Sequence, residues 1–274
     1  MDTDRRITTD SSEKTTAVDK ALAILEAFCY RESELSLASL SKLLNIPKTT
    51  LVSPLRTLEK WGYLYRIPVS GNYQLGYKAM QLNYHYRNAL PILQYAKPIL
   101  RDLQEKTGEI IYMVTHVNGQ IFYLDCAFPS RIDIAYSTSG KTLLMHNTGS
   151  GKGMLANLPQ AEVDAILDKY GLPYATPNTI TDRGELMKEL AKIREKGYSY
   201  DNGEESHNAY CISMPILDNT GIAVGAVSVS GSVVSMGGDK RLKYLPSLSH
   251  ACQLLSQYNA LFPVIHLPYG SSLS

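Results

Sequence analysis

The stretch ELSLASLSKLLNIPKTTLVSPLRTLEKWGYL, residues 34–64, decides the fold of the first part of the chain. Ser36 is placed to cap a short helix, whose inner side consists of leucines. The connection at residues 45–47 is tight, and Pro47 suits the first position of the next helix. That helix also has an apolar side of leucines, and Trp61-Gly62-Tyr63 ends it. The leucines of the two helices are Leu37, Leu40 and Leu44, followed by Leu51, Leu55 and Leu58.

The sequence on either side of this stretch completes a small module. Two short strands are expected downstream, at residues 63–67 and 73–75, joined by a turn-rich segment. Upstream, apolar side chains at helical spacing predict a first helix. Its apolar positions are Val18, Ala21, Leu22, Leu25, Phe28 and Cys29. Three short helices followed by a two-stranded wing are the winged form of the helix-turn-helix, whose third helix enters the DNA major groove.

Positive charge is concentrated in this module. The 274 residues carry 27 Lys and Arg against 26 Asp and Glu, a net charge of +1. Residues 42–87 hold seven basic residues and one acidic residue, a net charge of +6, whereas residues 91–274 have a net charge of −2. A basic segment in a nearly neutral chain favours a polyanion partner such as DNA. A solvated basic surface would give the same count.

The third helix of the module offers the groups that DNA recognition needs. With its leucines directed inward, the other side presents hydroxyls and cations that can reach base edges and phosphates. A three-helix bundle with a soluble face would show the same leucine spacing. The candidate DNA-binding residues are Lys48, Thr49, Thr50, Ser53, Arg56 and Lys60.

The remainder of the chain is typical of a mixed α+β domain. Proline interrupts a long helical stretch that ends at residue 106. Beyond it, β-rich runs are expected at 109–116, 120–127, 132–137, 211–217 and 222–230, and helices at 160–170, 184–196 and 239–260. We therefore expect a disordered segment over 1–16, the winged module over 17–77, a linker helix over 78–106, a second domain over 107–260 and a flexible tail over 261–274.

Composition excludes a disordered chain and a collagen-like repeat. Apolar residues make up 44% of the chain and charged residues 19%, an ordinary globular balance. No apolar run reaches the roughly 18 residues of a membrane-spanning helix, and the polar start lacks the apolar core of a secretory signal. The four cysteines form no CxxC pair. We therefore expect free thiols in a reducing cytosol, and hence a cytoplasmic protein.

Short motifs in both halves point to one known family. The module contains PKTTL at 47–51, TL at 57–58, GY at 62–63 and YQLG at 73–76. The second half contains GSGK at 149–152, TIT at 179–181, REKGY at 194–198, DNGE at 201–204, CISMPI at 211–216 and SVSG at 228–231. In these motifs the chain resembles the IclR family of bacterial transcription regulators. The resemblance implies an α+β protein with an N-terminal winged helix-turn-helix, a linker helix and a C-terminal GAF/profilin-like effector-binding domain.

The same resemblance implies a pocket for a small carboxylic acid in the second domain. A glycine-rich turn leading into a helix at Met154 would offer backbone N–H groups to an anion. Each candidate also has a structural explanation, since a buried strand cysteine is often a packing thiol and serines alternate with valines on any half-buried strand. The candidate effector-binding residues are Gly149, Ser150, Asp201, Cys211, Ser228 and Ser230.

The chain departs from the family pattern in two places. Relatives usually have His-Arg-Leu where this chain has Val52-Ser53-Pro54. A proline two turns into a helix removes a backbone hydrogen bond, so we expect a kinked or shortened recognition helix and an unusual operator preference. The segment 206–210 is also unusual, with Asn208 where relatives have glycine and with Tyr210 adding a hydroxylated ring.

Two further patterns favour other functions. Residues 135–142 fit a relaxed phosphate-binding loop, although such a site also needs a following helix and a downstream metal-binding Asp. Cys211 and His207 have the residue types of a nucleophile pair but no orienting third group. The histidines lack the short spacings of zinc sites, although a spatial cluster among His116, Cys126, His146 and His207 stays open.

The sequence therefore predicts a ligand-responsive, DNA-binding transcriptional regulator of the IclR type that controls genes for the catabolism of a small organic acid. Its expected partners are a double-stranded DNA operator, a small-molecule effector such as a carboxylate, and further copies of the chain in a homodimer or homotetramer. No catalytic residue, metal or cofactor is expected. The alternatives are a small-molecule-converting enzyme with an incidental helix-turn-helix pattern and a helical adaptor that binds protein.

Overall fold

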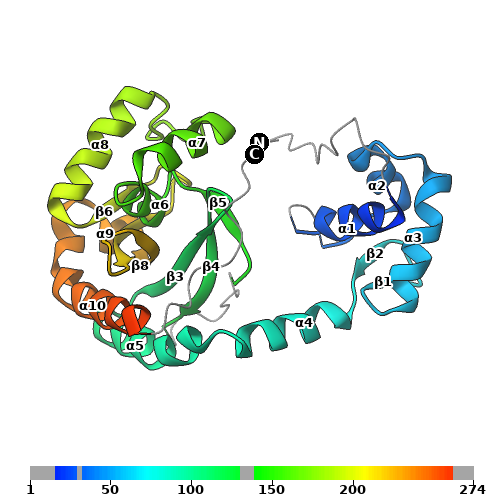
Figure 1. The fold of residues 1–274 in the computed structure, drawn as a ribbon, viewed down its shortest axis with the longest axis horizontal. Helices are drawn as coiled ribbons and strands as arrows, with labels where there is room; N and C mark the ends of the chain where they lie inside the picture. The colour runs from blue at the N-terminus through cyan, green and yellow to red at the C-terminus, as the bar shows by residue number, and fades with distance from the viewer. Residues whose placement is uncertain (1–15, 30–32, 130–138, 262–274) are drawn as a thin grey trace. The chain divides into compact units, whose positions relative to one another are not determined.

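The chain divides into two compact units, Met1–Ala89 and Leu90–Ser274 (Figure 1). The structure, a computed structural model, describes residues 16–29, 33–129 and 139–261. The expectations of a disordered segment over 1–16, of a strand at 132–137 and of a flexible tail over 261–274 concern residues outside these ranges. The exceptions are Thr16, which caps the first helix, and Leu261, which ends the last one. The boundary between the units falls inside the predicted linker, which consists of two helices, α4 (Tyr77–Asn88) in the first unit and α5 (Pro91–Thr107) in the second.

The first unit is three helices followed by a two-stranded wing. Ser36 caps α2 by accepting a hydrogen bond from the Ser39 N–H, as expected, and a left-handed Asn45 ends the helix. The wing strands pair antiparallel, with Leu64 opposite Leu75. The core consists of apolar side chains from all three helices and the wing. The elements are α1 (Ala17–Ala27), α2 (Leu37–Leu44), α3 (Lys48–Lys60), β1 (Leu64–Arg66) and β2 (Tyr73–Leu75).

The buried side of α1 differs from the expected one. Ala23, Ile24 and Ala27 are buried, whereas Val18 and Leu22 are 65% and 54% exposed. α1 is apolar around most of its circumference, and its packing against α3 selects one of two overlapping apolar stripes. Helical spacing in the sequence could not distinguish these stripes. Of the expected positions, Phe28 is buried and Ala21 and Leu25 pack against the core, whereas the expectation was wrong for Val18, Leu22 and Cys29.

Pro54 lies inside α3 without shortening it. The helix runs from Lys48 to Lys60, so the expectation of a shortened recognition helix is wrong, and Pro47 is the N-cap rather than the first helical residue. Pro54 has no N–H to donate to the carbonyl of Thr50. Buried leucines on both sides of Pro54 hold the two halves of α3 against the core of the unit. A kink at this position stays a prediction.

The second unit is built on a six-stranded antiparallel sheet with the strand order β5-β4-β3-β8-β7-β6. The two runs joined by Asn118-Gly119 pair as the hairpin β3–β4, with both residues of the turn at positive φ. The strands are β3 (Ile110–Val117), β4 (Gln120–Ala127), β5 (Thr142–Leu144), β6 (Ser199–Asn202), β7 (Tyr210–Leu217) and β8 (Ala223–Gly231). β5 and β6 were not predicted from sequence, because runs of three and four residues are too short to show strand alternation.

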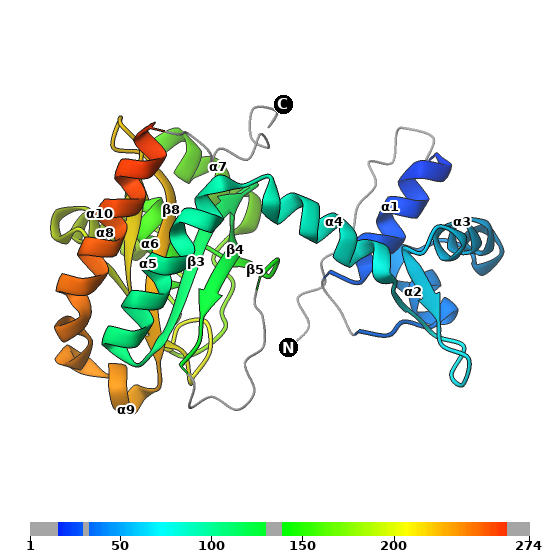
Figure 2. The ribbon, with the colours of Figure 1, turned by 90° about the horizontal axis from the view of Figure 1, so that it is seen from below.

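Helices cover both faces of this sheet. α5 and α10 lie side by side on one face (Figure 2), where their apolar side chains form one core cluster with the strands. On the other face α6, α7 and α8 form a second cluster. The predicted helix over 239–260 is instead a 3₁₀ segment followed by α10. The helices are α6 (Gly149–Leu155), α7 (Gln160–Tyr170), α8 (Arg183–Lys196), α9 (Val233–Met236), the 3₁₀ helix η1 (Gly238–Tyr244) and α10 (Leu245–Leu261).

Within the described ranges, every helix is too short or too polar to cross a lipid bilayer. All four cysteines lie in these ranges and are free thiols, with Cys211 and Cys252 buried.

Candidate nucleic-acid interface and ligand cavity

The outer side of α3 presents all six residues predicted to contact DNA. Each of them is exposed, while the three leucines of the helix are buried. The basic side chains of this set form no ion pair with any described residue, so their charges are available to phosphates. The tight connection from α2 places this helix on the surface of the unit. The exposed residues are Lys48, Thr49, Thr50, Ser53, Arg56 and Lys60.

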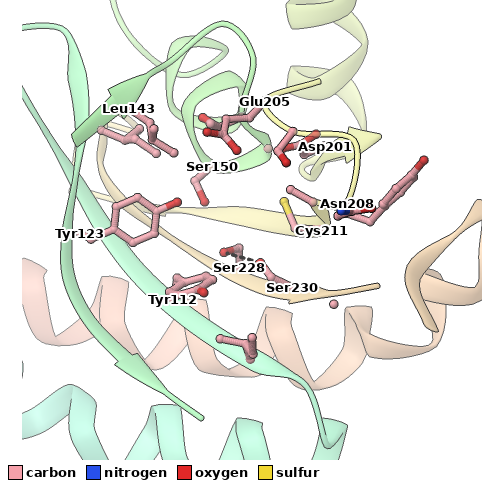
Figure 3. Close-up of a pocket in the computed structure, with 18 of the residues that line it drawn as sticks. Tyr112, Tyr123, Leu143, Ser150, Asp201, Glu205, Asn208, Cys211, Ser228 and Ser230 are labelled. Atoms are coloured by element: carbon pink, nitrogen blue, oxygen red, sulfur yellow. Dashed lines mark hydrogen bonds between the residues drawn. The ribbon is translucent and has the colours of Figure 1, made fainter. Parts of the chain in front are cut away.

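The second unit contains a cavity of about 510 Å³ between the sheet and the start of α6. This volume lies within the range of roughly 300–1,000 Å³ that is typical of small-molecule sites. All six residues predicted to bind an effector line the cavity, and Figure 3 shows five of them labelled around one space. They are Gly149, Ser150, Asp201, Cys211, Ser228 and Ser230.

Strand register explains why residues far apart in sequence meet here. Asp201 of β6 lies opposite Cys211 of β7, which lies opposite Ser230 of β8, which lies opposite Ile110 of β3. These positions form one row across four strands. A neighbouring row runs Ser199, Ser213, Ser228 and Tyr112. The two rows place hydroxyl, thiol and carboxyl groups on adjoining strands, and side chains of both rows line the cavity.

The glycine-rich segment is the first turn of a helix rather than a turn that precedes one. α6 begins at Gly149, and the Thr148 hydroxyl caps it by accepting a hydrogen bond from the Gly151 N–H. The expected helix start at Met154 is therefore wrong. A Cβ on Gly149 would lie 2.5 Å from the Cys211 sulfur and 3.1 Å from the Asp201 nitrogen. Only glycine allows the helix to begin this close to β6 and β7.

Asp201 is buried at the wall of the cavity, with 4% of its surface exposed. One carboxyl oxygen accepts a hydrogen bond of 2.8 Å from the Glu204 N–H. Among the described residues the second oxygen has no hydrogen-bond partner. Burial, together with the nearby Glu204 and Glu205 carboxylates, raises the pKa of Asp201 to about 7 from its ordinary value of 3.8. The group is therefore close to half protonated at neutral pH.

A buried ion pair holds the residues around Asp201 in place. The Lys152 ammonium lies 2.5 and 2.7 Å from the two carboxylate oxygens of Glu204, and both side chains are almost fully buried. Lys152 belongs to α6 and Glu204 follows β6, so the pair joins the helix to the edge of the sheet. Thr176 and Thr179 also donate hydrogen bonds to the backbone carbonyls of residues 203 and 204.

The hydroxyl of Ser150 has only acceptor capacity left for a ligand. Ser213 has a single hydroxyl hydrogen, which it donates to the Val227 carbonyl at 2.9 Å. The contact of 3.0 Å between Ser150 Oγ and Ser213 Oγ therefore has Ser150 as the donor. The Ser150 side chain therefore offers a ligand only the lone pairs of its oxygen.

Cys211 is a buried thiol beside Asp201. Burial, reinforced by the Asp201 charge, raises the pKa of this thiol to about 12. The thiolate that a nucleophile needs is therefore scarce at neutral pH. His207, the other member of the pair considered from sequence, is exposed.

Several residues that line the cavity are not among the candidates predicted from sequence. The side chains of Tyr112 and Tyr123 project into it from β3 and β4 (Figure 3), and burial raises the pKa of both phenols. Alternation along these strands was visible in the sequence, but it could not say which face would adjoin the cavity. The residues missed include Glu109, Tyr112, Tyr123, Lys141, Leu143 and Glu205.

The other patterns do not form sites in the part of the chain that the structure describes. Lys141 and Thr142 of the phosphate-loop pattern lead into strand β5 rather than into a helix, which such a loop requires. No group of three or more His, Cys, Asp or Glu side chains in the described ranges is arranged to hold a metal ion.

Two family models match the chain. Residues 17–68 match the IclR helix-turn-helix domain, and residues 84–257 match the C-terminal domain of the bacterial transcriptional regulator IclR. Among curated proteins, the HTH-type transcriptional regulator XynR of Escherichia coli is 33% identical over 78% of this chain and 85% of its own length. The transcriptional repressor IclR of Escherichia coli is 26% identical over 82% of each chain.

Solved structures show the same fold. The Thermotoga maritima IclR structure has a TM-score of 0.68 and 27% identity, covering 88% of this chain and 97% of that one. An IclR homologue of Microbacterium hydrocarbonoxydans, solved in complex with 4-hydroxybenzoate, has a TM-score of 0.74 and 20% identity, covering 88% and 98%.

Replacing Lys152 with Met is expected to destabilise the protein by about 3–5 kcal/mol, because it leaves the Glu204 carboxylate buried without its partner. Lys152→Met combined with Glu204→Leu is expected to recover much of this loss. The matched control is Lys106→Met, which removes an exposed ion pair with Asp102 and costs less than about 1 kcal/mol. Urea denaturation measures all three, and equal losses for the two single variants would contradict the buried pair's role.

The stability of the protein is expected to depend on pH through Asp201. The folded chain keeps a proton on Asp201 that the unfolded chain releases above pH 3.8, because the pKa in the fold is about 7. The free energy of unfolding therefore falls as pH rises from about 4 to about 7, by an amount on the order of a few kcal/mol.

Asp201→Asn is expected to remove this contribution and to melt at a higher temperature than the wild type at pH 8. Asp102→Asn, at an exposed position on α5, is the control and should leave the pH profile unchanged. Thermal melts from pH 4 to pH 8 check the prediction. Parallel profiles for the wild type and Asp201→Asn would show that Asp201 titrates normally.

Proposed function

The chain belongs to the IclR family of bacterial transcriptional regulators, and we propose which of its two units binds DNA and which binds the effector. It is a ligand-responsive DNA-binding regulator. The outer side of α3 contacts the operator through the six exposed residues that start at Lys48. The cavity beside Asp201 holds the effector. The observation that carries this proposal is the convergence of all six predicted effector residues on one cavity.

The proposed mechanism is linkage between the two binding events. An effector that binds one arrangement of the second unit better than another shifts the population of the arrangements, and by reciprocity it changes the affinity for DNA. We propose that the regulator acts as a homodimer or homotetramer in the cytoplasm, because two-fold symmetric operators require paired recognition helices. Control of genes for the catabolism of a small organic acid is the regulatory role proposed.

The cavity offers limited support for a carboxylate effector. Among the described residues that line it, Lys141 carries the only positive charge, and it is exposed. We propose that a carboxylate on the effector would lie toward Lys141. The relative from Microbacterium was solved with an aromatic hydroxy acid, 4-hydroxybenzoate, which supports a small organic compound as the class of ligand.

We propose that the cavity binds its ligand without converting it. The relatives are transcriptional regulators, and the raised pKa of the Cys211 thiol argues against a cysteine nucleophile in this cavity. An enzyme would turn over its ligand and would show no salt-dependent binding to DNA. A protein-binding adaptor would prefer no DNA sequence over another. The operator preference expected from Ser53 and Pro54 stays a prediction.

Arg56→Ala is expected to weaken binding to the DNA that flanks the protein's own gene by about tenfold. If Arg56 contacts a phosphate, the slope of log affinity against log salt also falls by about 1, because one fewer counterion is released. Arg101→Ala is the control, since Arg101 is also an exposed arginine but lies on α5. Gel-shift titrations over a salt series measure both. Unchanged affinity for Arg56→Ala would remove it from the interface, and no binding by the intact wild type at low salt would overturn the proposed function.

Ser228→Ala is expected to weaken effector binding by up to about tenfold, the effect of one neutral hydrogen bond. Ser228 lines the cavity and lies far along the chain from α3, so the affinity for DNA without effector should be unchanged. Ser256→Ala on α10, whose hydroxyl bonds the Leu217 N–H, is the control for a lost hydroxyl outside the cavity. Gel shifts with and without 4-hydroxybenzoate and a panel of small organic acids measure the response. An unaltered response would place the effector elsewhere.

A further inference from the structure

The cavity has two walls of different hydrogen-bonding character. On one wall, Asp201 offers a free carboxyl oxygen and Ser150 offers only lone pairs. On the other, the hydroxyl-bearing residues Ser228 and Ser230 are joined by a long contact of 3.5 Å, and Tyr112 and Tyr123 project inward (Figure 3). The side chains of the first wall therefore accept hydrogen bonds, and those of the second can both donate and accept them.

The charges near Asp201 disfavour an anion at the first wall. Lys152 is the cation closest to it, and both oxygens of Glu204 already bind that ammonium. Arg241 bonds the carbonyl oxygen of Asp201 at 3.2 Å, and its guanidinium lies over the Tyr200 ring rather than beside the carboxyl group. The Glu205 carboxylate, which also lines the cavity, adds negative charge. A ligand carboxylate at this wall would meet like charge without a compensating cation.

We propose that the effector is a polyhydroxylated compound whose hydroxyl groups donate to the free oxygen of Asp201 and to Ser150, with Asp201 as the residue that determines this specificity. Hydroxyl groups match both walls because each can donate to the first wall and exchange hydrogen bonds with the second. A ligand carboxylate has no hydrogen to donate to the side chains of the first wall, and a ligand ammonium has no lone pair to accept the hydrogens of the second wall. The inference rests on the proposed function, since it names the class of effector for the same cavity.

The protonation state of Asp201 makes this specificity depend on pH. A ligand hydroxyl donates to the ionised carboxylate, and the pKa of Asp201 is about 7. Affinity should therefore be about tenfold lower at pH 6 than at pH 8 and should level off above that. The titratable and charged groups that face Asp201 are Lys152 from α6, Glu204 and Glu205 after β6, Cys211 from β7, Tyr123 from β4 and Arg241 from η1.

The test is isothermal titration calorimetry of the full chain with three sets of unbranched probes of five and six carbons. The first set is neutral polyols such as glucitol, the second is their acids such as gluconate, and the third is acids without hydroxyls such as hexanoate. At least one polyol or hydroxy acid is expected to bind at pH 8 and to bind about tenfold more weakly at pH 6. Hexanoate is expected not to bind measurably.

Two variants distinguish the effect of the Asp201 carboxylate from the effect of the protein's overall charge. Asp201→Asn is expected to weaken the bound probe tenfold or more and to remove the pH dependence, because the amide bears no charge to lose. Asp102→Asn on α5 should change neither. The pH profile of the wild type needs no variant, so a misfolded variant would not leave the proposal undecided.

Three results would overturn the proposal: binding of hexanoate alone, affinity that increases as pH falls, or no binding by any hydroxylated probe. A gel shift with the flanking DNA on the same preparation separates this failure from failure of the proposed function. Salt-dependent DNA binding without polyol binding would reject only the class of effector. Loss of DNA binding would reject the regulator itself, whatever the calorimetry shows.

Discussion

The geometry of the cavity depends on the buried ion pair between Lys152 and Glu204. Two opposite charges that are buried away from water are stable only when they pair through hydrogen bonds. Here the Lys152 ammonium donates to both carboxylate oxygens of Glu204. The pair fixes α6 against the end of β6, the strand that carries Asp201. Because the ammonium binds Glu204, one oxygen of the Asp201 carboxyl group keeps no hydrogen-bond partner among the described residues, and burial together with the nearby carboxylates raises the pKa of Asp201. One interaction thus sets both the shape of the cavity wall and its charge.

The first unit was predictable from sequence because its signals are local. Capping by Ser36, the leucine spacing of α3 and the short wing all act over a few residues. Tertiary packing decided the two features that sequence did not predict, the buried side of α1 and the full length of α3. α1 offers two apolar stripes, and its contact with α3 buries Ile24 rather than Val18. Pro54 fails to end α3 because the buried leucines on both sides stabilise the helix across the missing hydrogen bond.

The cavity was predictable only in part, and for a different reason. Resemblance to a family supplied Asp201 and Cys211 as candidates, whereas residue pattern alone favoured a packing role for the thiol. What the sequence could not supply is the register that aligns β6, β7, β8 and β3, since a shift of one residue would turn these side chains to the opposite face. Nor could the sequence show that Lys152, in a motif expected to bind an anion, instead forms a buried ion pair with Glu204.

The same strands connect the cavity to α5, the helix at which the second unit starts. Tyr112 of β3 lines the cavity, and its chain neighbours Ile111 and Met113 point to the opposite face, into the cluster that contains α5. α5 begins at Pro91, directly after the boundary between the units. A ligand that moves β3 therefore moves residues packed against the helix at which the second unit starts. Close packing transmits such a shift, because a core without voids repacks between discrete arrangements instead of absorbing it. Coupling then requires only that the ligand favour one of those arrangements, which is the condition for linkage between effector and operator binding.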